Sequence, residues 1–359
     1  MAQSFDLHTR ATTRRILRFV LIAVIIGLGV NVLLSLLVDR GQYFASLRKV
    51  RVVYFVVPLL LFIASYAVDA LRTMIVVAQF RIRIHFLQAF YNSAVGSFFL
   101  NTTPMSAGGQ PFQIWHMSSI GVPLDAATNL IASRFVEQAI TSVIIVLLSL
   151  TQVSWIASSL RISPLLIYGA LGITLAMTGI LIFFLVRPLL IGRLAVGLEK
   201  TGFGRLVARL SGRHAWGRSL HRWSHRLRTS VRTLWSKKAP AMLLDTLLGA
   251  VNIVLHAWSL HYVLQGVTGT SLPLGMVIIT YVILWQIVVY VPTPGASGGV
   301  EGAFTLVYAG LTGALESTIV AIFVWRLASY YLLILFGGLV YSLLGRWTRE
   351  PTHRVSVLP

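Results

Sequence analysis

The sequence predicts an all-α polytopic membrane protein with six full spans, two broken re-entrant helix pairs and an inverted-topology repeat. The chain is 56% hydrophobic and only 11% charged, with a mean hydropathy of +0.80, whereas soluble domains carry about 25% charged residues. Apolar runs of membrane-spanning length recur along it, and two similar Pro/Gly-rich motifs interrupt two further apolar runs. We expect residues 1–359 to form a single transmembrane domain.

Six apolar runs have about the 20 residues that a helix needs to cross the hydrocarbon core. They cover residues 19–38, 52–78, 126–150, 162–186, 241–265 and 316–345. The first run follows Arg14, Arg15 and Arg18, and no clear cleavage site of small residues comes after it. We therefore expect a retained span with a cytoplasmic N-terminus.

Two other apolar runs, 86–103 and 274–291, lead into motifs that a regular helix cannot cross. The first motif reads NTTPMSAGGQP (101–111) and the second reads VPTPGASGGVE (291–301). Proline removes a backbone donor and clashes with the preceding turn, and glycine is costly inside a helix. Since a short apolar piece follows each motif (112–120 and 302–313), we expect two broken, re-entrant helix pairs.

The two motifs are predicted to be copies of one another. Thr103, Pro104, Gly108 and Gly109 match Thr293, Pro294, Gly298 and Gly299 at an offset of 190, and Asp125 and Arg134 have counterparts in Glu316 and Arg326. The repeat-bearing halves cover about 52–186 and 241–345. A duplicated broken helix is typical of transporters that bind their substrate near the bilayer midplane.

Loop charge predicts the orientation. Residues 187–240 carry 13 Lys/Arg and one acid, Glu199, and such loops stay in the cytoplasm. If each broken pair returns to the side from which it entered, both termini are cytoplasmic and the two pairs enter from opposite faces. Four basic residues do not follow the rule, because this topology places them on the outer side of the membrane: Arg40, Arg48, Lys49 and Arg51.

The basic loop 187–240 mixes Arg and His with apolar residues such as Trp216 and Trp223. This pattern is typical of helices in the headgroup plane. We expect it to contact the anionic headgroups of membrane lipids rather than nucleic acid. A homo-oligomer is a further partnership that the sequence allows.

The half-helices that start near Gly109 and Gly299 would offer free N–H groups and a positive dipole end to an anionic headgroup. Tight turns between short helices are the structural alternative. Arg134 and Arg326 suit a phosphate or helix packing, and Glu301 and Glu137 would read a cationic substituent or carry protons. For Glu301 the alternative is to cap its helix. The expected substrate-binding residues are Thr103, Pro104, Gly108, Gly109, Gln110, Arg134, Glu137, Pro294, Gly298, Gly299, Glu301 and Arg326.

Spacing within the spans predicts further polar contacts. Arg134 and Glu137 are three residues apart and can pair, as can Asp69 and Arg72. Polar residues recur at helical spacing on the span 241–265 and form one stripe: Asp245, Asn252, His256 and Ser259. Such a stripe indicates either hydrogen bonds to a neighbouring helix or the lining of a water-filled pathway.

Several kinds of chemistry are not indicated. The chain has no cysteine, no GxxxxGK[ST] loop and no HExxH or GxSxG motif, and its histidines lack metal-ligand spacing. We therefore expect no cofactor, no metal site and no enzymatic activity.

The paired motifs, Thr103-Pro104 with Gly108-Gly109 and Pro292-Thr293-Pro294-Gly295 with Gly298-Gly299-Val300-Glu301, resemble the lysylphosphatidylglycerol synthase transmembrane family, also called flippase-like domain proteins. The resemblance covers about residues 16–345. It implies an inner-membrane protein that moves lipids, in the best-known members an aminoacylated phosphatidylglycerol. Those members also have a soluble aminoacyl-transferase domain, which we do not expect here because about 14 residues follow the last span. The first copy also lacks the Pro-Gly pair and has Pro111 in place of Glu301.

The leading hypothesis is a flippase or scramblase of the cytoplasmic (inner) membrane. Its substrate would be an anionic-headgroup phospholipid or a polyprenyl-phosphate-linked lipid. One alternative is a membrane enzyme acting on a lipid carrier, with a metal at Asp69 or Asp125. The other is an accessory subunit of a cell-envelope lipid enzyme.

Overall fold

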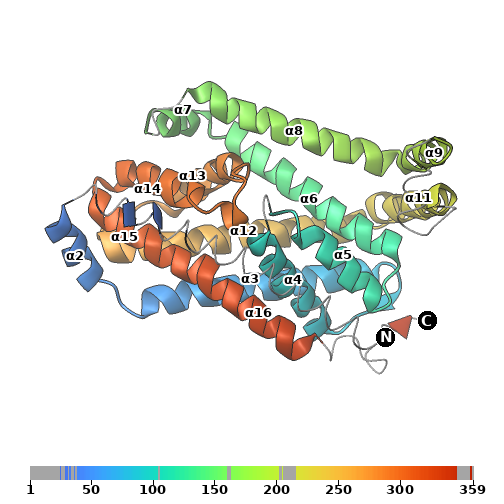
Figure 1. The fold of residues 1–359 in the computed structure, drawn as a ribbon, viewed down its shortest axis with the longest axis horizontal. Helices are drawn as coiled ribbons and strands as arrows, with labels where there is room; N and C mark the ends of the chain where they lie inside the picture. The colour runs from blue at the N-terminus through green and yellow to red at the C-terminus, as the bar shows by residue number, and fades with distance from the viewer. Residues whose placement is uncertain are drawn as a thin grey trace.

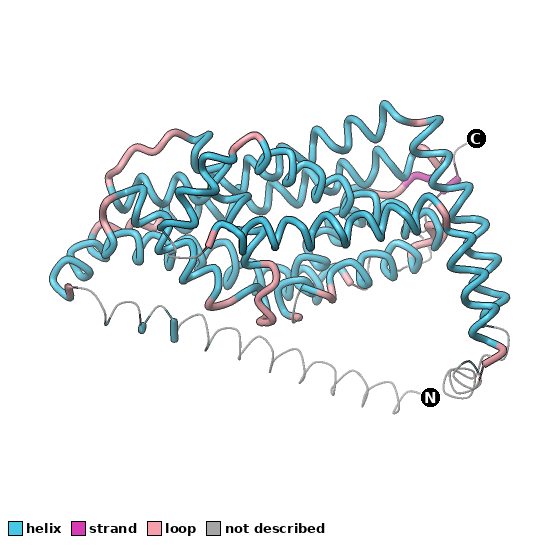
Figure 2. Tube along the Cα trace, turned by 90° about the horizontal axis from the view of Figure 1, so that it is seen from above, coloured by secondary structure: helices cyan, strands magenta, loops and turns pink. Residues whose placement is uncertain are grey.

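The computed structural model describes residues 39–103, 106–159, 163–201 and 216–345, together with positions 25, 29, 30, 32, 33, 36, 204, 356 and 357. Nearly all described residues are helical, and most helices lie along the long axis of the molecule (Figures 1 and 2). Of the predicted first span, 19–38, only isolated positions are described. The all-α class expected from the composition is confirmed.

Five helical segments are long and apolar enough to cross a membrane. They are α3 (Val53–Ala78), α6 (Leu124–Leu147), α8 (Pro164–Val186), α12 (Ala239–Thr268) and the segment Leu315–Leu344. The last segment joins α15 (Leu315–Arg326), the π-helical turn η4 (Leu327–Tyr331) and α16 (Leu332–Leu344). These five agree with the apolar runs that predicted them.

Local sequence signals set several of the helix ends. Ser163 precedes α8, and its hydroxyl accepts a hydrogen bond from the N–H of Leu165 at 3.2 Å. Pro164 then occupies the first turn, where a missing N–H costs nothing. Glycine sets the C-terminal end of α12. The helix ends at Thr268, and Gly269 follows with a positive φ of 74° that closes the last turn.

Both predicted helix interruptions are present. The first motif separates α4 (Phe86–Thr102) from α5 (Gly109–Ser119). The second separates α13 (Leu274–Val288) from α14 (Gly299–Thr312), with the short 3-10 turn η3 (Pro294–Ala296) between them. In each case the second helix folds back on the first. The side-chain amide of Asn92 donates to the carbonyl of Gln113 at 2.9 Å, and the hydroxyl of Tyr308 donates to the carbonyl of Val277 at 3.1 Å.

The order of elements is the same in the two halves. A long helix (α3 or α12) is followed by a folded-back pair (α4–α5 or α13–α14) and then by another span (α6 or α15–α16). The two long helices pack against each other in antiparallel directions. The hydroxyl of Tyr54, near the start of α3, donates to the carbonyl of Gly266 near the end of α12, whereas Arg72 of α3 contacts Asp245 near the start of α12.

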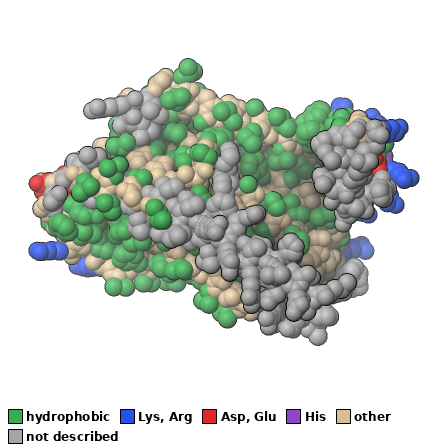
Figure 3. All heavy atoms as spheres, viewed as in Figure 1, with side chains coloured by type: hydrophobic (Ala, Val, Ile, Leu, Met, Phe, Trp, Pro, Cys, Tyr) green, Lys and Arg blue, Asp and Glu red, His purple; other side chains and the backbone are tan. Residues whose placement is uncertain are grey.

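The remaining described elements lie mostly at the ends of the molecule. They are α2 (Arg40–Arg48), α7 (Leu150–Ser159), α9 (Pro188–Glu199), α11 (Trp216–Arg232), the π-helical turn η2 (Thr233–Lys237) and the paired two-residue strands β1 (Ile82–Arg83) and β2 (Ser356–Val357). Helix α2 lies at one end of the long axis, and α9 and α11 lie at the opposite end (Figure 1). Lys and Arg side chains gather at these two ends, with hydrophobic side chains covering much of the surface between them (Figure 3).

Candidate functional site

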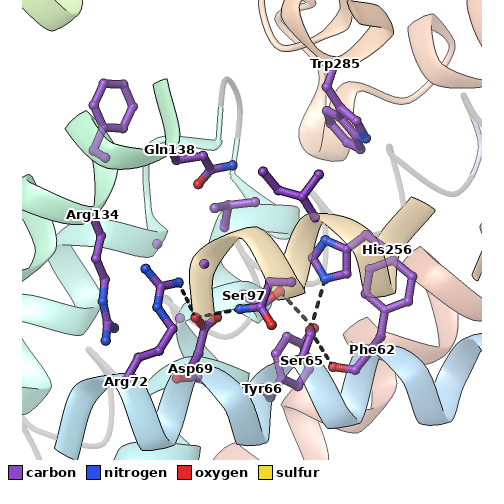
Figure 4. Close-up of a pocket in the computed structure, with 18 of the residues that line it drawn as sticks. Phe62, Ser65, Tyr66, Asp69, Arg72, Ser97, Arg134, Gln138, His256 and Trp285 are labelled. Atoms are coloured by element: carbon purple, nitrogen blue, oxygen red, sulfur yellow. Dashed lines mark hydrogen bonds and ion pairs between the residues drawn. The ribbon is translucent and has the colours of Figure 1, made fainter. Parts of the chain in front are cut away.

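A cavity of about 390 Å³, lined by both polar and apolar side chains, lies within the helix assembly. Its walls come from α3, α4, α5, α6, α12, α13 and the α15–η4–α16 segment. Figure 4 shows Ser65, Asp69 and Arg72 of α3 along one side of it, with Gln138 of α6 and Trp285 of α13 on the other. Because surfaces from both halves of the chain enclose it, the cavity is the natural candidate for a site shared by the two halves.

The cavity brings together five of the residues expected to bind substrate. These are Gly109, Gln110, Arg134, Glu137 and Arg326. Six others do not line it in this conformation: Thr103, Gly108, Pro294, Gly298, Gly299 and Glu301. Pro104 lies outside the described residues. The residues of the second motif therefore do not line the cavity themselves. Arg326, which contacts Gly295 and Glu301 of this motif, lines the cavity instead.

On one side of the cavity, Asp245 holds two arginines. Its carboxylate oxygens accept from Arg72 Nε at 3.0 Å and Nη2 at 3.3 Å, and from Arg134 Nη2 at 3.0 Å and Nε at 3.3 Å. The Asp245 side chain is fully buried. Two forked, charge-assisted contacts on one carboxylate form a strong and directional arrangement, which joins α3, α6 and α12 at the cavity wall.

Further polar groups extend this cluster. Asp69 accepts from Arg72 Nη1 at 2.9 Å and from the amide of Asn252 at 2.8 Å, and Arg134 Nη1 donates to the Thr73 hydroxyl at 2.9 Å. The expected Asp69–Arg72 pair is thus present. We refer to Asp69, Arg72, Arg134, Glu137 and Asp245 as the charged cluster.

The expected pairing of Arg134 with Glu137 was wrong. Arg134 turns to Asp245 on the neighbouring helix, and Glu137 instead has its Oε2 atom 3.7 Å from Arg72 Nη2. Spacing along one helix allows a pair to form, but a buried carboxylate on α12 offers Arg134 a two-pronged contact. The stronger tertiary partner takes the guanidinium.

A second buried ion pair joins Glu301, the last residue of the second motif, to Arg326 of α15. The Nε–Oε1 distance is 2.8 Å, and the two side chains are 0% and 3% exposed. The other oxygen of Glu301 accepts from the N–H of Gly298 at 2.7 Å, and Arg326 Nη2 donates to the carbonyl of Gly295 at 3.2 Å. In this conformation Glu301 therefore caps α14, as the structural alternative predicted.

Glycine is required at the start of α14. Gly298 has a φ of +88°, in the region that residues with a side chain rarely adopt. This turn directs its N–H toward the carboxylate of Glu301. The positive dipole end of α14 is thereby occupied by a side chain of the protein.

Tyr330, in η4, links the two motifs. Its hydroxyl lies 3.1 Å from the carbonyl oxygen of Asn101, at the end of α4, and 3.1 Å from that of Pro294. The Arg326 guanidinium lies over the ring, with Cζ 4.2 Å from the ring centre. A π-helical turn in an α-helix often marks a functional position. No local spacing could have indicated this role, because the contacts join residues far apart in the chain.

Outside the cavity, the basic loop contributes exposed arginines at the end of the molecule. On α11 these are Arg218, Arg222, Arg226, Arg228 and Arg232. Arg226 forms an ion pair with Asp125 of α6 at 3.5 Å, and the Trp235 indole donates to the Ser133 hydroxyl at 3.0 Å. Within the described ranges, no group of three or more His, Cys, Asp or Glu side chains is placed to hold a metal ion.

Comparison with known proteins identifies one relationship. The model of a family described as "Lysylphosphatidylglycerol synthase TM region" matches residues 20–337. No curated protein and no solved structure matches the chain significantly. The match covers both interrupted helices, the charged cluster and the Glu301–Arg326 pair.

Proposed function

The chain belongs to the lysylphosphatidylglycerol synthase TM region family, and on this premise we propose that it is a flippase or scramblase for a lipid with an anionic headgroup. The substrate class includes aminoacylated phosphatidylglycerol and polyprenyl-phosphate-linked lipids. The headgroup would occupy the central cavity while the acyl chains stay in the bilayer. The protein would act by moving lipid, not by transforming it.

The observation that carries this proposal is the pair of arginines at the cavity. Arg134 and Arg326 follow the two motifs at matching positions and both line the cavity. A guanidinium is a planar fork that binds phosphate oxygens in pairs. Both guanidiniums are held by buried carboxylates, so an arriving phosphate would compete with Asp245 and Glu301 for them.

The dimensions of the cavity fit a headgroup better than a whole lipid. A volume of about 390 Å³ lies at the lower end of the range for small-ligand pockets, about 300–1,000 Å³. Large apolar side chains such as Leu60, Leu147 and Leu335 are exposed on the outer faces of helices whose other residues line the cavity. A lipid could keep its chains against such a surface while its headgroup enters the polar interior.

The folded-back pairs support a site at membrane depth. Helix α5 has 11 residues, which corresponds to about 16 Å at 1.5 Å per residue and is far less than the roughly 30 Å core. The antiparallel packing of α3 on α12 supports halves of opposite orientation. We infer that both pairs are re-entrant and that they approach the midplane from opposite faces, as in inverted-repeat transporters.

Lys and Arg lie at both ends of the molecule, but the larger number belongs to the segment 187–240, which includes α9 and α11, and this excess supports the orientation. We place α9 and α11, and both termini, on the cytoplasmic side of the inner membrane, following the positive-inside rule. The exposed arginines of α11 would then contact anionic headgroups of the inner leaflet. Helix α2 would lie on the outer side.

The test is movement of a fluorescent phosphatidylglycerol across vesicles that contain the purified protein. Gln138→Glu adds a negative charge at an exposed cavity position without changing side-chain size. It is expected to slow movement of this anionic lipid about tenfold, equivalent to roughly 1.4 kcal/mol of repulsion. The matched control, Gln265→Glu, lies at the far end of α12 and should behave like the wild type.

Equal rates in protein-containing and empty vesicles would overturn the proposal. A lipid product formed by the purified protein in detergent would favour an enzyme. Stable co-purification with a cell-envelope enzyme, without lipid movement, would favour an accessory subunit.

A further inference from the structure

The charged cluster contains one acid more than it has cations. Asp69, Glu137 and Asp245 face Arg72 and Arg134 from α3, α6 and α12. Asp245 receives four guanidinium N–H contacts, and Asp69 receives one from Arg72 and one from Asn252. The two arginines are therefore used mainly by the two aspartates.

Glu137 is the carboxyl group left over. Its side chain is 6% exposed, and among the described residues neither of its oxygens accepts a hydrogen bond. Its nearest cation, Arg72 Nη2, is 3.7 Å from Oε2 and is already bonded to Asp245. An ionised carboxylate so placed would be a poorly compensated charge away from bulk water, which is strongly unfavourable.

A proton on Glu137 removes this imbalance. With a neutral Glu137, two guanidiniums face two aspartates and the cluster has no net charge. Glu137 also lines the cavity. Its two carboxyl oxygens are buried in this conformation, so exchange of a proton with the cavity requires movement of the surrounding side chains. The other acid near the cavity is Glu301. One of its oxygens accepts from Arg326 and the other from the N–H of Gly298, so neither oxygen lacks a hydrogen-bond partner.

We propose that Glu137 is a proton-binding site whose occupancy is coupled to the binding of an anionic headgroup in the cavity. The proposal rests on the function proposed above. An anionic headgroup adds a negative charge beside the cluster, which favours the neutral form of Glu137. By reciprocity, protonation of Glu137 favours binding of the headgroup. Proton and lipid then move in the same direction, and the proton is taken from water on one side and released to water on the other.

The charged and titratable groups that face Glu137 set the sign of this coupling. Arg72 and Arg134 favour the carboxylate, whereas Asp69 and Asp245 favour the protonated form. His256 of α12 also lines the cavity and is hydrogen-bonded to Ser65 at 3.0 Å. Because both arginines are bonded to the aspartates, they compensate a charge on Glu137 only weakly.

The first experiment needs no lipid movement. Infrared difference spectra of the purified protein, recorded between acidic and alkaline pH, should show the carbonyl band of a protonated carboxyl group. The band should be lost in Glu137→Gln and shifted in Glu137→Asp. It should be unchanged in Glu316→Gln, the control acid outside the cavity. A band that persists unaltered in both Glu137 variants would overturn the assignment, and Glu137→Asp decides the matter if Glu137→Gln does not fold.

The second experiment measures movement of fluorescent phosphatidylglycerol in vesicles at the same two pH values. Lipid movement by the wild-type protein should be about tenfold or more faster at acidic than at alkaline pH. Lipid movement by Glu137→Gln should be fast at both pH values. A wild-type rate without pH dependence would overturn the coupling even if the infrared band is assigned to Glu137. Absence of any lipid movement by the wild type would refute the transport function instead, and the infrared result would still decide the proton site.

Discussion

The hydroxyl of Tyr330 lies 3.1 Å from the backbone carbonyl of Asn101, a residue 229 positions earlier in the chain. The same hydroxyl lies 3.1 Å from the carbonyl of Pro294. One side chain of η4 thus contacts the end of α4 and the second motif together. The two interrupted helices are joined at this point, beside the cavity that we propose as the headgroup site.

Removal of this hydroxyl should loosen the junction. Tyr330→Phe keeps the ring under Arg326 but leaves the two carbonyls without this donor. We expect a loss of about 0.5–1.5 kcal/mol in the free energy of unfolding, seen as a lower melting temperature by tryptophan fluorescence in detergent.

The neighbouring tyrosine supplies the control. The Tyr331 hydroxyl is buried and has no hydrogen-bond partner among the described residues. Tyr331→Phe removes a polar group that is not hydrogen-bonded there, so its stability should be unchanged or higher. Equal losses in the two variants would show that the Tyr330 contacts do not hold the motifs together.

Asp245 should be among the most sensitive positions in the chain. Asp245→Asn keeps the size of the side chain but leaves Arg72 and Arg134 without their shared counter-ion. Breaking a buried pair in this way costs about 3–5 kcal/mol, and we expect poor folding or a large drop in melting temperature. The control is Asp125→Asn, which removes the pair with Arg226, a residue that is 65% exposed. That change should cost no more than about 1 kcal/mol, and similar losses at both positions would contradict the role given to Asp245.

The Glu301–Arg326 pair should behave as one unit. Glu301→Gln leaves the buried guanidinium without a charge partner, and Arg326→Gln leaves the buried carboxylate. Each single change is expected to cost about 3–5 kcal/mol. The double variant should cost clearly less than the sum of the two, because no unpaired charge remains. Melting temperatures of the four proteins of this double-mutant cycle measure the coupling. Additive losses would mean that the residues act separately.

The sequence alone was sufficient for the features that depend on local patterns. Apolar length predicted the five described spans, and proline and glycine predicted where α4 and α13 end. The spacing of Asp69 and Arg72 predicted their contact, since residues three apart share one face of a helix. Each of these depends on only a few neighbouring residues.

Contacts between distant helices could not be predicted in this way. Arg134 is 111 residues from Asp245, and Tyr330 is farther still from Asn101. The sequence placed Asp245 in a polar stripe of α12 but could not say that α3 and α6 would both deliver an arginine to it. A lone acid in an apolar span signals a partner, without naming which one. The expected Arg134–Glu137 pair failed for the same reason, because a tertiary partner displaced the local one.

Gly295 should tolerate no side chain, in contrast to a glycine of the adjoining helix. Its φ of +59° disfavours any other residue, and an added Cβ would overlap the Tyr330 ring. Gly295→Ala should therefore displace the ring from its contacts with Asn101 and Pro294. We expect a loss of about 1–3 kcal/mol, measured by thermal unfolding, together with slower lipid movement. Gly302 lies within α14 and has no atom within 4 Å of an added Cβ. Gly302→Ala should leave stability unchanged or raise it by up to about 1 kcal/mol, because alanine is the better helix former. If the two variants unfold at the same temperature, close packing at η3 does not stabilise this motif.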